Sequence, residues 1–425
     1  MFTKLRTPSG TRDFLPSEMV DQGYIEERFR EVFRSWGYDE IRSPTIEFLD
    51  ALTVGIGSEL SDNMFKFQDF DGKIVALRSE MTAPVARIVA SKMVSTPEPI
   101  RLSYITNVFR HSRSYVDRLR EFWQAGVELI GLGTPDADAE VLALLFTSLE
   151  EVGLKDVRVD VSHAGLLKEL LRAVSLDREK EHDLRALMGY RDWKQLEEFM
   201  RQNELPAELG EVFQGLGRAR KLSEVSATFP LLSKFPDAQS FMKNLLAIHE
   251  ILEDYGYADR LFFDFSLTRR IEYYTGIIFE ASVPQVGSPI GGGGRYDDLI
   301  RKFGNIGVPA TGFAIEVEKC LQALSAQGSS TPMSTGVRIL VSSQSRNGAL
   351  KALDAIRKVG AIGLLDLRCE NKAKTMNYAR LAGIDFIVFV SDSALREPVT
   401  ILNVQSNRIE TVELRDFLKS IGGTA

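Results

Sequence analysis

The sequence has 425 residues, 44% of them apolar and 26% charged, and its formal net charge of −7 argues against a protein that coats nucleic acid in general. Its two cysteines, Cys320 and Cys369, are far apart and its four histidines are scattered, so we expect neither a disulfide framework nor a metal centre. The N-terminus lacks an apolar signal core and no apolar run could cross a bilayer, so we expect a cytoplasmic protein of two or three domains.

The first hundred residues predict a helix, a hairpin and a second helix. Residues 17–36 carry apolar side chains at helical spacing, with Ser17 as the N-cap. Residues 64–80 have the pattern of a β-hairpin with its turn at an Asp-Gly pair. The helical pattern returns over residues 82–94. The N-terminal part therefore mixes helices with strands.

Residues 101–109 and 121–131 are typical of two strands joined by a polar loop. One face of the second strand is apolar and is expected to pack on helices; it consists of Trp123, Ala125, Val127 and Leu129. The other face places Gln124 and Glu128 on either side of Gly126, with no side chain between them. A water-exposed sheet face would also give this pattern, but the flanking apolar side chains favour the floor of a pocket.

The middle of the chain is dominated by helical patterns. They extend almost without interruption from about 138 to 255 and predict a helical insertion over about 170–255. Strands are expected at 260–267 and 273–283. The glycine run at 291–294 predicts a turn that leads into a helix.

The C-terminal part is set off by a linker. Residues 323–335 are small and polar and contain proline, which favours a break between a core of 1–322 and a domain of 336–425. In this last stretch short strands and helices alternate, as in a small α/β domain. It carries 13 Lys and Arg against 9 Asp and Glu, an excess that an RNA-facing surface or ordinary solvated helices would explain equally well.

Four segments resemble the class II histidyl-tRNA synthetases. They are GTRDFLP at 10–16, LRSEMTAPVAR at 77–87, FRHSRSYVDRLREFWQAGVELIG at 109–131 and TRRIEYYTGIIFE at 268–280. One segment alone would be weak, but four in the family's order and at its separations are specific, and the similarity spans the whole chain. The resemblance implies an α+β fold with a synthetase-like antiparallel sheet, flanking helices, a helical insertion and a small C-terminal α/β domain like the anticodon-binding module.

The same resemblance implies a pocket for free L-histidine. The histidine-binding residues of the family map to Glu80, Thr82, Arg110, Gln124, Glu128, Arg269, Tyr273 and Tyr274. Carboxylate and amide acceptors suit an ammonium group and an imidazole N–H, whereas a guanidinium suits a carboxylate. The tyrosines would supply apolar walls with polar tips. The alternative is that some of these residues only form a buried hydrogen-bond network.

The nucleotide-binding motifs depart from the synthetase pattern. Ser112 stands where synthetases usually carry an acidic residue, and SYVDR at 114–118 replaces Pro-Gln-x-Gly-Arg. The motif 3 pattern Gly-x-Glu-Arg is Glu316-Val317-Glu318-Lys319 here, and Arg270 stands where the family has glycine. A carboxylate at Glu316, on the small-residue face of its strand, would repel a triphosphate. Together these changes predict a decayed ATP site.

A paralogous family fits this profile: the regulatory subunits of ATP phosphoribosyltransferase, which resemble synthetases that have lost aminoacylation. NVFR at 107–110, GSPIGGGGRYDDLI at 287–300 and PATGFAI at 309–315 are more similar to this family. Glu80, Arg269 and the C-terminal domain are closer to the synthetases. The resemblance implies a non-catalytic subunit without a cofactor, required for the first step of histidine biosynthesis and mediating feedback inhibition by histidine.

The resemblance also implies partners. They are a second copy in a homodimer formed near residues 20–50, and the short-form catalytic subunit of ATP phosphoribosyltransferase in a hetero-oligomer. The alternative function is a histidine–tRNA ligase, which would use ATP with magnesium and would bind tRNA. Another synthetase-like paralogue with a different amino acid or protein partner is the third possibility.

Overall fold

The computed structural model describes most of the chain. The described residues are 5–55, 61–111, 119–174, 176–190, 192–205, 210, 212, 221, 224–225, 236–265, 267, 273–304, 306–329, 336–343, 345–368, 371–391 and 397–421. The chain divides into two compact units, Met1–Thr331 and Pro332–Ala425. Within the described residues, every helix is too short or too polar to pass through a membrane.

The larger unit is built on an eight-stranded sheet with the order β1-β5-β6-β11-β10-β9-β7-β8. Its strands are β1 (Asp39–Glu40), β5 (Ile100–Phe109), β6 (Glu121–Ile130), β7 (Arg158–His163), β8 (Leu261–Phe263), β9 (Ile277–Ser282), β10 (Gly291–Arg295) and β11 (Ala310–Glu316). Neighbouring strands are antiparallel except for β1 with β5 and β7 with β8. The predicted α+β class with a mainly antiparallel sheet is confirmed.

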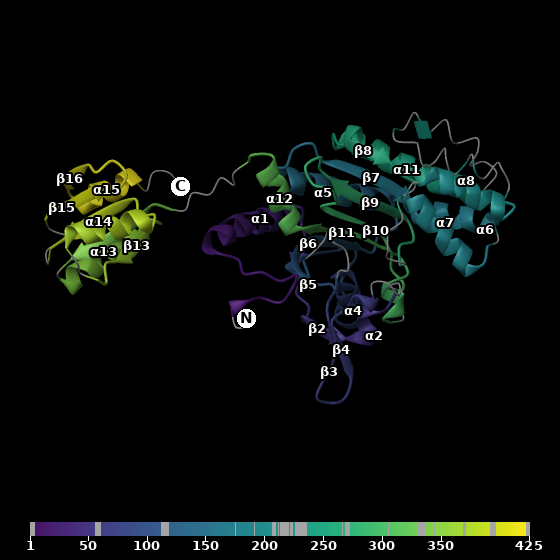
Figure 1. Ribbon diagram of the computed structural model, residues 1–425, viewed down its shortest axis with the longest axis horizontal. Coiled ribbons are helices and arrows are strands. Elements are labelled where there is room, and N and C mark those ends of the chain that lie inside the picture. The colour runs from purple at the N-terminus through teal and green to yellow at the C-terminus, as the bar shows by residue number, and fades with distance from the viewer. Residues whose placement is uncertain are drawn as a thin grey trace. The chain divides into compact units, whose positions relative to one another are not determined.

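Helices cover one face of this sheet (Figure 1). They include α1 (Pro16–Ser35), α5 (Pro135–Glu151) and α12 (Val317–Ala326). Ala125, Val127 and Leu129 are fully buried in the core cluster that these helices share with the sheet. Because side chains alternate along a strand, Gln124, Gly126 and Glu128 face the other way, as predicted.

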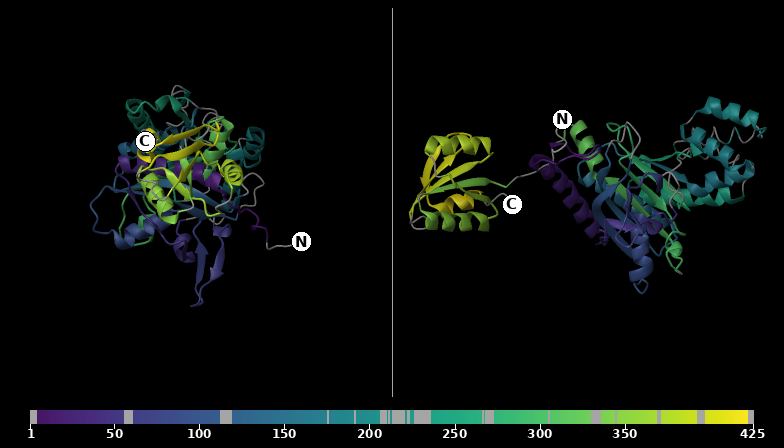
Figure 2. Two further views of the ribbon diagram at one scale, coloured as in Figure 1. Left: turned by 90° about the vertical axis from the view of Figure 1, so that its left-hand side faces the viewer. Right: turned by 60° about the horizontal axis from the view of Figure 1, so that its bottom comes forward.

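The opposite face carries α4 (Thr82–Lys92), α2 (Leu49–Leu52) and a small three-stranded sheet, β2-β4-β3. The strands of this sheet are β2 (Ile46–Phe48), β3 (Lys66–Gln68) and β4 (Ile74–Leu77). The hairpin of β3 and β4 projects from the larger unit in every view (Figure 2). Its turn contains Gly72 at φ +78°, a conformation that favours glycine, so the predicted hairpin is confirmed.

Three local predictions are wrong. Helix α1 begins at Pro16 with Leu15 as its N-cap, rather than with Ser17, and Glu18 Oε2 accepts the Leu15 N–H at 3.0 Å. The glycine run is not a turn but lies in β10, between β9 and β11, because glycine has no side-chain periodicity that would mark a strand. Strand β7 interrupts the stretch that was expected to be almost wholly helical.

Within the described part of the chain, helices lie in and next to the stretch expected to be a helical insertion. They are α6 (Ala164–Val174), α7 (Arg178–Tyr190), α8 (Trp193–Gln202) and α11 (Pro236–Asp254). The described residues of the larger unit also form 3₁₀ turns at Ala258–Arg260 and Ile300–Lys302. Helix α12 ends at Ala326, so the stretch expected to be a linker begins inside a helix, and its last residues lie outside the described part of the chain.

The smaller unit has a five-stranded sheet with the order β13-β12-β14-β15-β16. Its elements are β12 (Arg338–Ser343), α13 (Arg346–Lys358), β13 (Ile362–Leu365), α14 (Lys372–Leu381), β14 (Phe386–Val390), β15 (Val399–Asn403), β16 (Ile409–Val412) and α15 (Leu414–Ile421). Ile339 and Val341 pack in a cluster with α13 and α15, whereas Leu340 packs in a cluster with α14. Helices therefore cover both faces of this sheet.

Candidate functional site

The polar face of β6 lies in the middle of the large sheet, between β5 and β11. Glu128 is opposite Gly312 of β11, and Gly126 is opposite Tyr104 of β5. A Cβ on Gly312 would lie 1.9 Å from Glu128 Oε2, and one on Gly126 would lie 2.5 Å from the Tyr104 hydroxyl. The two glycines therefore make room for a carboxylate and a phenol on the floor of the site.

Glu128 is surrounded by hydroxyl groups. Its Oε1 accepts from Thr82 Oγ1 at 2.9 Å and from the Tyr104 hydroxyl at 3.5 Å, and its Oε2 accepts from the Tyr296 hydroxyl. The residue is 1% exposed, and this burial raises the pKa of Glu128 to about 8, although the hydroxyl groups oppose the shift. A bound N–H donor would favour the ionised form of this carboxyl.

Glu80 is a second buried carboxyl group, at the start of α4. Its two oxygens accept the backbone N–H groups of Thr82 at 2.7 Å and of Ala83 at 2.9 Å. The Tyr273 hydroxyl donates to Glu80 Oε2 at 3.5 Å. Burial raises the pKa of Glu80, and the two backbone bonds counteract it. Neutral donors thus hold both carboxyl groups, and Glu128 Oε2 and Glu80 Oε1, with one such donor each, keep an acceptor position that a ligand's ammonium or imidazole N–H could use.

Three tyrosine rings stand beside these carboxyl groups. The ring centroid of Tyr273 lies 5.6 Å from that of Tyr296, in an edge arrangement, and 5.1 Å from that of Tyr274. Tyr274 lies against Gly294, where an added Cβ would be 2.9 Å from its ring. Tyrosine combines a flat apolar face with a polar tip, so this wall suits a flat heteroaromatic group.

Gln124 shares the polar face of β6 with Glu128, and Arg110 lies near Glu80. Gln124 is 5% exposed, and its Oε1 has no hydrogen-bond partner among the described residues. An unpaired buried acceptor is costly, so a ligand donor would stabilise this side chain. Arg110 donates its Nε to the Ser79 carbonyl at 2.8 Å, and its guanidinium carbon lies 5.2 Å from the ring centroid of Phe122. Ser79 directly precedes Glu80 in the chain, so this bond holds the arginine side chain near Glu80.

The structure brings most of the predicted histidine-binding residues together. Hydrogen bonds or ring contacts link Glu80, Thr82, Glu128, Tyr273 and Tyr274. Gln124 shares the β6 face, and Arg110 follows the end of β5. Arg269 lies outside the described residues. Histidine binding by this set stays a prediction.

Sequence reasoning missed two residues of the site, Tyr104 and Tyr296. Both donate to Glu128, and both are buried. The alternation of β5 could have identified Tyr104, because a large side chain opposite Gly126 belongs on the same face. Tyr296 follows the glycine run and was hidden by the interpretation of that run as a turn.

The lysine of the altered motif 3, Lys319, forms an ion pair with the first residue of the motif, Glu316. Lys319 Nζ lies 3.0 Å from Glu316 Oε2 and donates to the Pro289 carbonyl at 2.9 Å. Glu316 is opposite Gln124 in the sheet register, so its carboxylate belongs to the polar face of the sheet. Both oxygens of Glu318 accept the Trp123 N–H at 3.0 Å, which gives this carboxyl group a structural role near the start of β6. Its burial raises its pKa to about 7.

The other altered nucleotide positions cannot be compared with the prediction. Ser112, the segment 114–118 and Arg270 all lie outside the described residues. Of the altered nucleotide motifs, only the motif 3 residues Glu316–Lys319 lie in the described part of the chain.

Comparisons with known proteins agree with the fold. Residues 10–320 match the family profile described as histidyl-tRNA synthetase. The chain is 38% identical to the ATP phosphoribosyltransferase regulatory subunit of Halothermothrix orenii, over 84% of this chain and 85% of that protein. It is 33% identical to the histidine–tRNA ligase of Methanocaldococcus jannaschii, over 93% of this chain and 94% of that protein.

Solved structures give the same picture. A structure described as an ATP phosphoribosyltransferase regulatory subunit/histidyl-tRNA synthetase from Bacillus halodurans has a TM-score of 0.79 and 29% identity, and the match covers 89% of this chain and 97% of that one. The histidyl-tRNA synthetase of Nostoc sp. PCC 7120 has a TM-score of 0.82 at 20% identity, covering 99% of each chain, and supports the fold alone.

Proposed function

This chain belongs to the histidyl-tRNA synthetase family, and we propose that it is a regulatory subunit of ATP phosphoribosyltransferase that binds free L-histidine. One observation carries the proposal. A buried set of acceptors suited to histidine is centred on Glu80 and on Glu128 of β6, and the neighbouring strand β11 ends at Glu316, which neutralises Lys319 of α12. The names of the relatives support the same assignment.

The site supports recognition of each part of histidine. The imidazole would lie along the tyrosine wall and give an N–H to Glu128, whose hydroxyl partners fix its orientation. The ammonium group would contact Glu80 and Gln124. Arg110 would pair with the carboxylate, as would Arg269 by its match to the family motif.

The nucleotide side supports loss of adenylation. A phosphate needs unpaired cationic or N–H donors. Lys319 already pairs with Glu316 and with a backbone carbonyl. It therefore offers a phosphate fewer hydrogen bonds and less positive charge than the planar guanidinium of an arginine would. We therefore assign no cofactor to this chain.

Regulation follows from linkage. Histidine can lower the activity of an assembly only if it binds the low-activity arrangement more tightly than the active one. The partners in the proposal are a second copy of this chain and the short-form catalytic subunit, in a hetero-oligomer required for the first step of histidine biosynthesis. The feedback inhibitor is histidine itself.

The second candidate is a histidine–tRNA ligase. Relatives with this name match at 33% to 35% identity over 93% to 94% of the chain. On this reading ATP with magnesium would be used, tRNA would bind, and Arg110 would contact the reacting groups.

Calorimetric titration with histidine and then ATP separates the two candidates. The proposal expects saturable histidine binding, weak ATP binding, no histidine-dependent ATP–pyrophosphate exchange, and histidine-sensitive activity after mixing with a short-form catalytic subunit. ATP–pyrophosphate exchange at ordinary enzymatic rates would contradict the regulatory subunit and support the ligase. Absence of histidine binding would refute both.

A further inference from the structure

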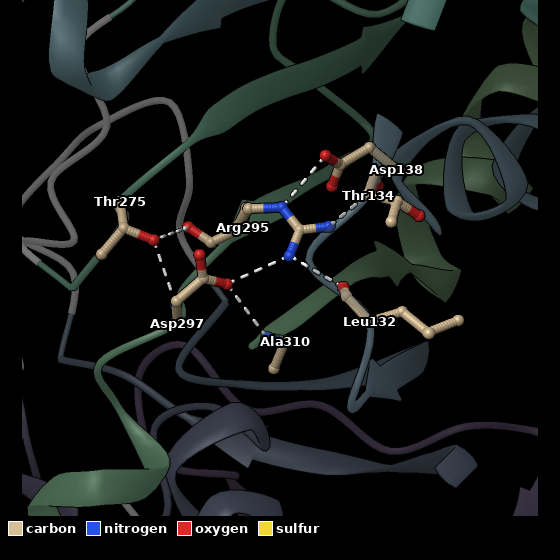
Figure 3. A network of polar contacts seen from close by, with 7 residues as sticks. All are labelled: Leu132, Thr134, Asp138, Thr275, Arg295, Asp297 and Ala310. Carbon is tan, nitrogen blue, oxygen red and sulfur yellow. Dashed lines mark hydrogen bonds and ion pairs between the residues drawn. The ribbon is translucent and has the colours of Figure 1, made fainter. Parts of the chain in front are cut away.

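Arg295, at the end of β10, is the centre of a buried polar network (Figure 3). Its Nε donates to Asp138 Oδ2 at 3.0 Å, and one Nη donates to Asp297 Oδ1 and to the Leu132 carbonyl, each at 3.0 Å. The other Nη donates to the Thr134 carbonyl at 3.4 Å. Arg295 is 6% exposed and Asp138 is fully buried. One guanidinium thus joins β10 to the segment that leads into α5.

The same network holds the two segments that carry the tyrosines of the site. The Thr275 N–H donates to the Arg295 carbonyl at 2.8 Å, and the Asp297 N–H donates to Thr275 Oγ1 at 3.0 Å. Asp297 Oδ1 also accepts the Ala310 N–H at 3.1 Å. Tyr296 lies between Arg295 and Asp297 in the chain, and the other two tyrosines directly precede Thr275. The network therefore ties the tyrosine wall to the start of β11.

The first four residues of β10 have no side chains that could hold the strand in place. Residues 291–294 are all glycine, the residue with the greatest backbone freedom. Arg295 is the first side chain after this run, and its fork of donors reaches two carboxylates and two carbonyls at once. A lysine could not reproduce that fork.

We infer that Arg295 is a positioning residue: by pairing with Asp138 and Asp297 it fixes the Tyr296 hydroxyl against Glu128, and so sets the affinity for L-histidine. The inference rests on the proposed function, because histidine is the ligand whose affinity it concerns. A supporting shell of this kind holds binding groups within a fraction of an ångström of their working positions.

Asp138→Asn tests this role, with Glu140→Gln as the matched control on the same helix. Glu140 pairs with Arg101 at 2.8 Å and accepts the Tyr38 hydroxyl at 2.9 Å. Neither partner belongs to the segments that carry Tyr273, Tyr274 and Tyr296. In calorimetric titrations, Asp138→Asn is expected to raise the dissociation constant for histidine about tenfold, which is about 1.4 kcal/mol. Glu140→Gln should change it less than about twofold, although both variants lose thermal stability.

A double-mutant cycle with Tyr296→Phe separates positioning from general loosening. If Arg295 acts through the Tyr296 hydroxyl, Asp138→Asn adds little once that hydroxyl is gone. Losses of affinity that simply add in the cycle would overturn the inference, as would unchanged affinity in a folded Asp138→Asn variant. Should this variant not fold, Asp297→Asn, whose side chain is 39% exposed, takes its place in the same cycle. A wild-type protein that does not bind histidine would overturn the proposed function and this inference with it.

Discussion

Thr82 donates its side-chain hydroxyl to Glu128 across 2.9 Å, which joins the first turn of α4 to the C-terminal half of β6. The two residues are 46 positions apart in the chain. The bond crosses from the helix to the sheet, so it fixes one side of the site against the other. Any loss of this contact should affect both ligand binding and stability.

Thr82→Val tests that bond. Valine keeps the shape but leaves Glu128 with one donor fewer, which should cost about 1 kcal/mol of stability. Histidine affinity should fall about tenfold, because the carboxylate loses part of its orientation. The control is Thr147→Val, which removes a hydroxyl bonded to the Ala143 carbonyl and near the Tyr257 hydroxyl, in the middle of α5. Equal loss of histidine affinity in the two variants, measured by calorimetry, would contradict the assignment.

The buried carboxyl of Glu128 makes stability depend on pH. Its pKa is about 8 in the folded protein, against an ordinary value of 4.5, so the folded state keeps a proton that the unfolded chain releases. Its contribution to stability is complete below about pH 4.5 and is lost as pH rises through about 8. Glu128→Gln has no such proton, so its stability relative to wild type should rise by roughly 1.4 kcal/mol for each pH unit between about 5 and 8.

Urea unfolding at several pH values measures this difference. Parallel stability curves for Glu128→Gln and wild type would show that the carboxyl is ionised in the folded state across the whole range. The same variant should bind histidine more weakly at every pH, because an amide cannot carry the negative charge that strengthens a bond to an N–H donor.

Strand alternation predicted the most important part of the site from the sequence alone. Gln124 and Glu128 lie on one face of β6 because side chains point to opposite faces at every step, and the apolar residues between them mark the face covered by helices. The contacts of Glu128 could not be predicted in the same way. Thr82 and Tyr296 reach it from distant segments, and no local pattern encodes their meeting.

The glycine run at 291–294, by contrast, was not predicted to be a strand. Strand β10 is held in the sheet by its backbone bonds to β9 and β11, not by any preference of its own residues. Propensity and periodicity both describe side chains, so a strand of glycines looks like a turn until its neighbours are known. The residues that depend on this strand, Arg295 and Tyr296, were therefore missed or given no role.

Gly126→Ala tests the close approach on the floor of the site. The new Cβ would lie 2.4 Å from the Phe313 carbonyl oxygen and 2.5 Å from the Tyr104 hydroxyl. Such overpacking is expected to cost about 1–3 kcal/mol or more and to displace the tyrosine from Glu128. In Gly23→Ala, the control in α1, the added Cβ meets no atom within 4 Å, so helix propensity should instead raise stability by up to about 1 kcal/mol. Thermal unfolding compares the two; a stable Gly126→Ala variant would refute the tight packing.

Glu316→Gln tests whether the ion pair with Lys319 weakens nucleotide binding. Removing the negative charge should strengthen ATP binding less than about tenfold, because the pair is partly exposed and screened by solvent. Fluorescence titration with a labelled ATP analogue measures the change. Glu410→Gln, which breaks an exposed pair with Arg408 in the smaller unit, should leave it unaltered. Unchanged ATP affinity in Glu316→Gln would show that the ion pair does not weaken nucleotide binding. The expected weak binding would then have to come from the other altered motifs.

The cap of α4 should disfavour anions that compete for the proposed histidine site. A helix that starts on exposed N–H groups attracts anions, whereas here the Glu80 carboxylate already takes the N–H groups of Thr82 and Ala83. The carboxylate thereby offsets the partial positive charge at the start of the helix. Sugar phosphates and dicarboxylates should therefore bind poorly at this position. In the proposed histidine site, this arrangement of charge would then select against the abundant anions of a cell and in favour of a small zwitterion.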